Sequence, residues 1–350
     1  MKKTIALMIA MALCFLLAAC GSGEEPGVTP DPAVSTLPGS EPAAESLEIA
    51  FAIPGSLTAL ESDSLDAWMA LVTEHSGGNI VINCTRESEL TGAALLEETK
   101  NGARDMAVTS TEELRAAIPE AVLLQLPFVF ESYAHAAAFF GGEPGGRLTE
   151  EFGGESGVRM LNTLFGGFRY ILSDMPLSTP EDCRGLLIRA PRVDVFTDML
   201  GIMEFSYIAM DWDEAYGAMS GGVITAVEGT LFELSDQRFY ELGSNVLCTR
   251  HMLNMSHVVV NEAWWSALTD EQRAILTDTL AEVAAEQWND SWAEEKLAQS
   301  ELEAEGVAFA ELEKSAKKDL QKTFEDYWQA ELEDFDKTAA DILDEILDLT

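Results

Sequence analysis

The spacing of apolar and polar residues between positions 47 and 265 predicts short strands that alternate with amphipathic helices. Apolar runs rich in β-branched residues are typical of buried strands, whereas apolar residues three and four apart are typical of helices. Strands are predicted over 47–53, 79–84, 105–108, 158–163, 168–173, 186–189, 224–228 and 257–260. Helices are predicted over 62–75, 91–101, 193–200 and 211–220. This alternation favours an α/β fold with a mostly parallel sheet and helices on both faces, formed twice over.

The C-terminal part of the chain has a helical pattern instead. Thr269-Asp-Glu-Gln272 has the form of a capping box, and we expect the helix that it opens to continue to about Ala304, where Gly306 ends it. A helical pattern resumes at Glu311. Residues 281–350 hold 21 acidic residues and six lysines, a net charge of -15. We interpret this charge as the solvated face of long amphipathic helices rather than a surface for a basic partner. The tryptophans of this region are expected to pack in the core; they are Trp288, Trp292 and Trp328.

The first twenty residues have the form of an export signal. Lys2 and Lys3 precede an apolar run from Ile5 to Ala19, and Leu-Ala-Ala stands directly before Cys20. A basic start, a short apolar stretch and small residues before the cut are typical of a secretory signal peptide, which we predict over residues 1–19. The Leu-Ala-Ala-Cys20 pattern resembles a bacterial lipobox and implies that Cys20 is lipidated. The alternative is an ordinary signal peptide with an incidental cysteine.

Residues 20–46 are rich in Pro, Gly, Ser and Glu and have almost no apolar side chains to bury. Such a segment cannot offset the entropy lost on ordering, so we predict a flexible linker. Together with lipidation of Cys20, it implies a mature protein that is exported and held at the outer face of the cytoplasmic membrane. The lipid anchor is the expected membrane contact.

Charge and composition exclude several classes of protein. The net charge of -40 argues against a nucleic-acid partner, because phosphates would be repelled. The cysteines that remain after cleavage have no C-x-x-C spacing, and the four histidines form no ligand pattern, so no zinc or other metal site is expected. No cofactor is expected either. The chain has no G-x-x-x-x-G-K-[ST], G-x-S-x-G or H-E-x-x-H motif, so we expect a protein that is not an enzyme.

An ordered series of short motifs resembles one family of binding proteins. In the centre of the chain these motifs are Phe168-Arg169, Thr179-Pro-Glu-Asp182, Gly185-Leu-Leu-Ile-Arg189-Ala-Pro191, Asp211-Trp-Asp-Glu-Ala-Tyr216 and Gly222-Val-Ile-Thr-Ala-Val-Glu228. Gly102-Ala-Arg-Asp105-Met106 and Leu126-Pro-Phe128 add to them in the N-terminal half. This series is similar to the dicarboxylate-binding (DctP-like) solute-binding proteins of tripartite ATP-independent (TRAP) transporters. The likeness covers roughly residues 47–300.

The resemblance implies a two-lobed periplasmic-binding-protein fold of the type II kind, with mixed sheets flanked by helices. It places an N-terminal lobe at 47–165 and a second lobe, which carries the main carboxylate-binding motif, at 166–265. Helices of residues 266–350 are expected to brace both lobes, with the long C-terminal helix crossing both.

The resemblance also implies a ligand site centred on Arg189, which stands before the Pro of the Ile-Arg-Ala-Pro stretch. The planar guanidinium matches a carboxylate with two parallel hydrogen bonds and stays charged at working pH. Arg169 matches a second family position that faces the ligand. Residues 164–195 hold four arginines and four acids and are neutral, so they supply a local positive focus in a very acidic chain.

Five further positions are implied at the same site. Trp212 falls where the family has an aromatic residue that lines the cleft; core packing is the alternative. Glu228 matches a family position, but Gly229 follows it where an Asn is usual. Arg192 occupies another position of polar ligand contacts. Glu89 matches a segment near the cleft, where the loop 55–58 is also expected.

The function implied by the resemblance is the capture of a small organic carboxylate and its delivery to the small and large membrane subunits of a TRAP transporter. Transport would then be driven by an ion gradient. An alternative is a ligand-sensing lipoprotein that reports to a membrane receptor.

Overall fold

The computed structural model describes residues 46–87, 91–151, 154 and 156–349. The predicted signal peptide, Cys20 and all but the last residue of the predicted linker lie outside these residues, as does Glu89. Within the described ranges no helix combines the length and the apolar character needed to cross a membrane.

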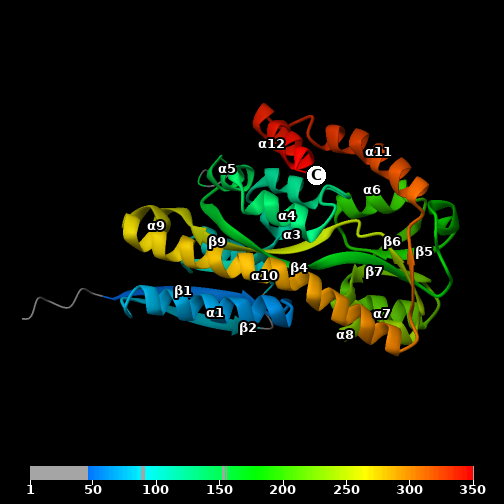
Figure 1. Ribbon diagram of the computed structural model, residues 1–350, viewed down its shortest axis with the longest axis horizontal. Coiled ribbons are helices and arrows are strands. Elements are labelled where there is room, and N and C mark those ends of the chain that lie inside the picture. Colours follow the sequence, from blue (N-terminus) through cyan, green and yellow to red (C-terminus); the bar gives the residue numbers. More distant parts are fainter. Residues whose placement is uncertain (1–45, 88–90, 152–153, 155, 350) are drawn as a thin grey trace, which may run out of the picture. The chain divides into compact units, whose positions relative to one another are not determined.

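Three parallel strands and their connecting helices make up the first half of the sheet, coloured from blue to cyan in Figure 1. Strand β1 (Leu47–Pro54) pairs in parallel with β2 (Ile80–Glu87) and with β3 (Met106–Ser110). Helices α1 (Ala59–His75) and α2 (Gly92–Lys100) connect these strands. Helix α1 begins earlier than predicted because its first turn is closed by a capping box.

The second half of the sheet repeats this alternation. Strand β5 (Leu187–Ala190) pairs in parallel with β6 (Ser206–Ala209) and with β7 (Ala226–Thr230). Helix α6 (Asp194–Ile202) connects β5 to β6, and α7 (Trp212–Ser220) connects β6 to β7. Parallel pairing of consecutive strands requires such crossover helices, so the predicted repetition is confirmed within each half.

Two long strands join the halves. Strands β4 (Val158–Ser173) and β9 (Leu253–Asn261) pair antiparallel with each other, β9 also pairs antiparallel with β3, and β4 with β7. The described strands therefore form a mixed sheet in the order β2-β1-β3-β9-β4-β7-β5-β6, with β8 and β10 attached beside β4. The prediction of two strands over 158–163 and 168–173 is wrong, because one strand runs through both. Gly167, with a φ of 109°, sits at an irregularity in the pairing of β4 with β9.

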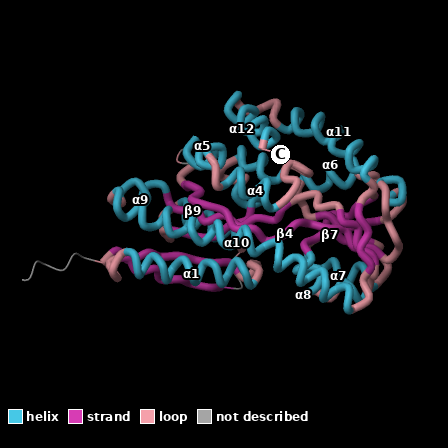
Figure 2. The backbone as a smooth tube through the Cα atoms, viewed as in Figure 1, coloured by secondary structure: helices cyan, strands magenta, loops and turns pink. Residues whose placement is uncertain are grey.

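Shorter elements fill in around this frame. They are α3 (Thr111–Leu114), η1 (Pro119–Gln125), α4 (Tyr133–Phe140), α5 (Glu143–Glu151), η2 (Pro180–Cys183), α8 (Leu231–Asp236), η3 (Phe239–Glu241), β8 (Asn245–Cys248) and α9 (Glu262–Ala267), where η denotes a 3-10 helix. In Figure 2 helices lie on both sides of the strands, with α4, α5 and α6 above them and α7 and α8 below. The core is thus covered on both faces, as the α/β prediction requires.

Helix α10 (Asp270–Ala304) passes both halves of the sheet. It packs against α1 in the first half and α8 in the second, and it crosses β4 between them (Figure 1). The helix opens at the Thr269 capping box and ends before Gly306, whose φ is 93°, as predicted. The expected long C-terminal helix is confirmed.

Buried polar side chains fasten α10 to β4 near its glycines. Gln287 makes both hydrogen bonds of an amide pair with the backbone of Phe165, at 2.9 and 2.7 Å. Glu295 accepts the Phe168 backbone N–H at 3.1 Å. It also accepts a hydroxyl from each half of the protein, from Tyr133 of α4 and Tyr170 of β4, both at 2.7 Å. The helix thereby satisfies backbone groups at the point where the ladder of β4 is irregular.

The C-terminal segment differs in detail from the prediction. A short strand, β10 (Ala308–Glu311), precedes α11 (Lys314–Glu331) and α12 (Lys337–Asp348). Trp288 and Trp328 are buried, as expected. The expectation that Trp292 packs in the core is wrong, because its side chain is 51% exposed and stacks against Lys296 instead.

Candidate ligand-binding site

A cavity of about 240 Å³, called here the inner cavity, lies where strands from both halves of the sheet end. Its wall includes Pro54 at the end of β1, Ser110 at the end of β3, Pro191 just after β5 and Thr230 at the end of β7. A second cavity of about 1110 Å³, the outer cavity, shares part of this lining. Open α/β sheets bind ligands beyond the carboxyl ends of their strands, so the inner cavity is the candidate site.

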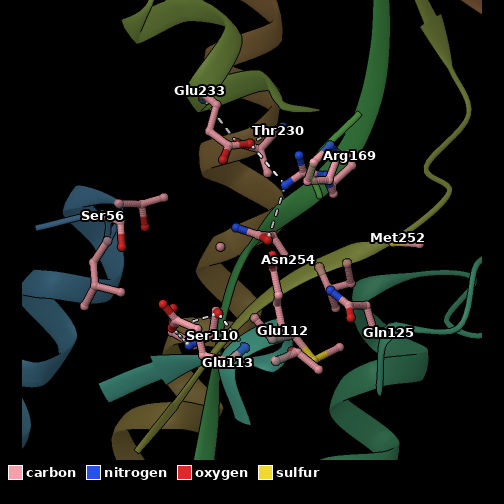
Figure 3. Close-up of a pocket in the computed structure, with 18 of the residues that line it drawn as sticks. Ser56, Ser110, Glu112, Glu113, Gln125, Arg169, Thr230, Glu233, Met252 and Asn254 are labelled. Atoms are coloured by element: carbon pink, nitrogen blue, oxygen red, sulfur yellow. Dashed lines mark hydrogen bonds and ion pairs between the residues drawn. The ribbon is translucent and has the colours of Figure 1, made fainter. Parts of the chain in front are cut away.

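Arg169 on β4 uses its whole guanidinium on protein partners. Nε and Nη2 donate to the two carboxylate oxygens of Glu228 at 2.6 and 3.0 Å. Nη1 donates to Glu233 at 3.3 Å and to Asn254 at 3.4 Å, contacts that are drawn in Figure 3. The ring of Phe196 packs against its guanidinium. Arg169 lines the inner cavity, but its N–H donors are already bonded to protein acceptors. Its role is therefore to stabilise the structure of the site.

Arg189 on β5 is in the opposite situation. Its Nε donates to the backbone oxygen of Met210 at 3.0 Å. Its Nη1 lies 3.7 Å from Glu228, too far for a hydrogen bond, and within the described residues neither terminal nitrogen has a hydrogen-bond partner. The Trp212 ring centroid lies 5.2 Å from Cζ and fixes the plane of the guanidinium. Two terminal N–H groups are therefore free to bind a planar anion.

One buried carboxylate serves both arginines. Burial by itself raises the pKa of Glu228, but Arg169 outweighs it and holds this pKa well below its usual range. Burial lowers the pKa of Arg189, an effect that Glu228 opposes and Arg169 adds to. His251 lies 3.5 Å from Glu228, and burial lowers its pKa, so it adds no third cation at neutral pH. Arg169 is paired with Glu228 and Glu233, whereas Arg189 has no carboxylate within hydrogen-bond distance among the described residues, so its guanidinium can pair with the anionic group of a ligand.

Three helices begin at the cavities, each with a glutamate in its capping box. The pairs are Thr58 with Glu61 in α1, Ser110 with Glu113 in α3 and Thr230 with Glu233 in α8. All three glutamates line the inner cavity. Sequence reasoning missed them, although the pattern Ser/Thr-x-x-Glu was present at each position and was read only at Thr269.

Trp212 and Arg192 have contrasting positions. Trp212 lines both cavities, and its ring stacks on the guanidinium of Arg189. Arg192 lines neither cavity. Its side chain is 61% exposed and pairs with Asp211 at 3.2 Å beside a separate shallow depression. Arg192 follows Pro191 in the connection between β5, which ends at Ala190, and α6, which begins at Asp194.

Glu228 and Gly229 do not line the cavities. Glu228 is completely buried beneath the arginines, where it serves as their counter-ion. A Cβ added to Gly229 would lie 3.2 Å from both Trp212 and Glu233, so those side chains already fill the space. Glu89 lies outside the described residues, but Thr91 and Gly92 after it line the outer cavity with the loop 55–58.

The thiols and acids of the described residues give no sign of metal chemistry. Within these residues no group of three or more His, Cys, Asp or Glu is placed to hold a metal ion. Cys84, Cys183 and Cys248 are free thiols. Burial raises the pKa of Cys183 and of Cys248 to about 12, so both stay protonated at neutral pH.

Several curated bacterial proteins are similar in sequence to this chain. A solute-binding protein of Roseobacter denitrificans is 28% identical over 218 residues, which cover 61% of this chain and 66% of the relative. The sialic acid-binding periplasmic protein SiaP of Vibrio cholerae is 24% identical over 252 residues, covering 72% of this chain and 78% of the relative. The C4-dicarboxylate-binding protein DctB of Bacillus subtilis is 26% identical over 227 residues, covering 64% of each. The matches thus span about two thirds of the length of these relatives.

Solved structures share the fold. A TRAP periplasmic solute binding protein from Ochrobactrum anthropi superposes with a TM-score of 0.78 at 23% identity, covering 87% of this chain and 95% of the other. One from Desulfovibrio desulfuricans, solved with sn-glycerol-3-phosphate, has a TM-score of 0.77 at 22% identity over 86% of this chain and 97% of the other. One from Chromohalobacter salexigens, with D-glucuronate, has a TM-score of 0.75 at 22% identity over 87% and 100%. The predicted fold class is confirmed.

The sequence motifs, the fold and the arginine-lined cavity all agree with one family description. The family model of the bacterial extracellular solute-binding proteins, family 7, named DctP, matches residues 55–334, well over half of the chain. The resemblance predicted from the motifs is confirmed: this chain belongs to the DctP family of TRAP solute-binding proteins.

Proposed function

We propose that this protein captures a small organic carboxylate in the inner cavity and delivers it to TRAP membrane subunits for uptake driven by an ion gradient. The observation that carries the proposal is the environment of Arg189. Its terminal N–H groups face a cavity and have no hydrogen-bond partner among the described residues, while Trp212 and the Met210 carbonyl hold the guanidinium in place. A carboxylate fits this fork with two parallel hydrogen bonds.

The size of the inner cavity agrees with a small ligand. Its volume of about 240 Å³ lies just below the range of about 300–1,000 Å³ that is typical of small-molecule sites. Relatives described as binding C4-dicarboxylates or D-glucuronate take acids of this size class. The same class is proposed for this chain.

The proposed mechanism is closure of two lobes around the bound acid. Residues 47–165 and 166–265 form the lobes, and residues 266–350 brace them. β4 and β9 pass between the lobes, and the irregular pairing at Gly167 is a suitable hinge because glycine tolerates the backbone change. The ligand stabilises the closed form by its higher affinity for it.

The membrane contact proposed for this protein is a lipid on Cys20, which would hold it at the outer face of the cytoplasmic membrane. The binding protein itself carries out no reaction in this scheme. A ligand-sensing lipoprotein would use the same cavity and differ only in its partner. Reconstitution with TRAP membrane subunits in proteoliposomes separates the two, because only the transport function predicts ligand uptake that depends on an ion gradient.

Calorimetric titration of C4-dicarboxylates and hexuronates tests the role of Arg189. Losing one member of a buried charge pair costs about 2–5 kcal/mol of binding, so Arg189→Ala should weaken the best ligand by about 30-fold or more. The matched control is Arg184→Ala, because Arg184 is exposed, pairs with Glu204 and lines neither cavity. Equal affinity of Arg189→Ala and the unaltered protein would refute the proposal.

A further inference from the structure

Carboxylates outnumber arginines around the inner cavity. Besides Arg169 and Arg189, its charged lining residues are Glu61, Glu112, Glu113 and Glu233. Figure 3 shows Glu112 and Glu113 across the cavity from Arg169, with Glu233 near the arginine. A ligand that carried only negative charge would satisfy Arg189 and be repelled by the opposite wall. The acidic residues of the lining therefore indicate a second chemical group on the ligand, in addition to its carboxylate.

The three capping-box glutamates have the same hydrogen-bond arrangement. In each, Oε2 accepts the bonds that close the helix start, from Thr58, Ser110 or Thr230. Oε2 of Glu233 also accepts from Arg169. Within the described part of the chain, Oε1 of these glutamates accepts no hydrogen bond. Helix capping thus uses one oxygen and leaves the other as an acceptor at the cavity.

Glu61 is the most informative of the three. Its residue is 2% exposed, and its buried Oε1 has no hydrogen-bond partner among the described residues. Burial raises the pKa of this carboxyl, and the nearby Ser256 and Thr58 hydroxyls lower it without offsetting burial. Buried polar atoms in native proteins are almost always hydrogen-bonded, because an unpaired one costs free energy. Capping does not account for this atom, since Oε2 suffices for the cap. A ligand donor in the inner cavity would satisfy it.

Glu112 adds a carboxylate that has no capping role. It follows Ser110 and Thr111 in the first turn of α3 and is exposed toward the cavity. Partial desolvation of the carboxyl raises the pKa of Glu112, and the neighbouring Glu113 raises it further. Arg169 and Arg189 oppose this shift. The acidic wall is therefore repulsive within itself, and a cation placed beside it would relieve that repulsion.

We propose that the ligand carries an ammonium group as well as a carboxylate, with the carboxylate on Arg189 and the ammonium against the acidic wall of Glu61, Glu112 and Glu113. An ammonium supplies three N–H donors and a positive charge, and both are lacking on that wall. Hydroxyl groups supply donors without charge and leave the repulsion in place. This inference rests on the proposed function, since it assigns the second end of the same ligand.

Capping boxes elsewhere in the chain provide a comparison. Thr269 is paired with a neutral Gln272, and the Thr179–Asp182 and Asp211–Glu214 boxes lie on exposed surface, where water completes the carboxylates. Around the inner cavity all three boxes use glutamate, and one of these is shielded from water. The concentration of charge at the cavity is thus not a requirement of capping.

Matched ligands that differ at one group test the proposal. The sets are L-aspartate with L-malate and succinate, 4-aminobutyrate with 4-hydroxybutyrate and butyrate, and D-glucosaminate with D-gluconate. Thermal-shift measurements on the purified protein select the set that binds best, and calorimetric titration then gives the affinities at pH 7. We expect the amino member of that set to bind at least about 10-fold more tightly than its hydroxy partner.

Each outcome has a defined meaning. Equal or tighter binding of the hydroxy or unsubstituted acid overturns the ammonium inference and leaves the carboxylate function standing. Failure of every acid in all sets to shift the melting temperature counts against the proposed function, and this inference fails with it. Tighter binding of the amino member, together with weaker binding of both members by Arg189→Ala, supports both proposals.

A pair of variants checks the acidic wall itself. Glu112→Gln removes one charge at the cavity and should weaken the amino acid by about 5-fold while changing the hydroxy acid less than 2-fold. Glu120→Gln is the matched control, because Glu120 lies in η1 and lines neither cavity. An unchanged ratio between amino and hydroxy acid in Glu112→Gln contradicts the placement of the ammonium.

Discussion

The second half of the sheet and the first half contribute opposite walls to the inner cavity, and they treat charge differently. On the second wall Arg169 is neutralised by a fully buried Glu228 and braced by Glu233 and Asn254. On the first wall Glu61 and Glu112 both line the cavity, and Glu113 lies beside Glu112; no ion pair involves Glu61 or Glu112 among the described residues. The Arg169 cluster of the second wall is electrostatically complete within the protein, whereas Arg189 and the acidic first wall become so only with a ligand.

This difference separates residues that stabilise the folded site from residues that bind the ligand. A buried, fully paired group such as Arg169 contributes to folding, and its removal should reduce stability. A group with an unused donor or acceptor at the cavity, such as Arg189 or Glu112, contributes little to folding and much to binding. Exposure alone does not distinguish the two arginines, because both are almost completely buried.

The largest effect on stability is expected from breaking the Arg169–Glu228 pair. Glu228→Leu leaves Arg169 buried without its main counter-ion and should lower the free energy of unfolding by about 3–5 kcal/mol, measured by denaturant titration. The double variant with Arg169→Met should recover a large part of this loss, because the unpaired charge is gone. Glu112→Gln on the other wall should change stability by less than about 0.5 kcal/mol. A stability loss in Glu112→Gln as large as that in Glu228→Leu would contradict the comparison.

The pairing of Glu228 with Arg169 should also make the stability of the fold depend on pH. The folded-state pKa of Glu228 lies below its ordinary value of 4.5. Its contribution to stability is therefore present above that value and is lost as the pH falls through it toward the folded-state pKa. Denaturant titrations between pH 7 and pH 3 should show a loss that is smaller in the double variant.

The next prediction concerns how the preference for an amino acid over a hydroxy acid depends on pH. Because burial raises the pKa of Glu112 and of Glu61 above 4.5, these carboxyls take up protons at a higher pH than ordinary glutamates do as the pH falls. The preference for an amino acid over its hydroxy partner should then shrink by about 3-fold, while the guanidinium of Arg189 stays charged. Calorimetric titration at pH 7 and pH 5 measures this, and a preference that grows at pH 5 would refute it.

The smallest effect is expected for the aromatic neighbour of Arg189. Trp212→Leu removes a stacking contact worth about 0.5–2 kcal/mol and should weaken acid binding by about 2- to 30-fold. Arg192→Ala serves as the comparison, since Arg192 lies outside both cavities, and it should change affinity less than 2-fold. A larger effect for Arg192→Ala than for Trp212→Leu would mean that the ligand extends over the exposed surface near α6.

Local sequence patterns predicted much of the fold. The helix that opens at Thr269 and ends before Gly306 follows from a capping box and a helix-breaking residue, both of which act within a few positions. The long strand β4 was predicted as two, because the paired glycines Gly166 and Gly167 interrupt the apolar pattern. Strand β10 was not predicted, since its pairing with β8 is a contact between distant parts of the chain.

Only part of the candidate site was predicted, because local motifs can be recognised in the sequence but contacts between distant segments cannot. Arg189 and Arg192 belong to one contiguous stretch and were both predicted at the ligand; the structure places Arg189 at the inner cavity and Arg192 outside both cavities. Glu61, Glu113 and Glu233 carry a readable helix-start pattern. Glu112 and Asn254 have no local signal, because strand order and register bring them to the cavity.

The sequence by itself determined the alternation of strands and helices, the start of the long C-terminal helix and the family, because these depend on neighbouring residues and on motifs in fixed order. Only the tertiary structure decided which charges are paired. Arg169 and Arg189 are both arginines at strand positions, yet Glu228, 59 residues after Arg169, bonds one and leaves the terminal nitrogens of the other unpaired. Hydrogen bonding depends on distances of about 3 Å between segments that the sheet brings together, and no local pattern specifies those distances.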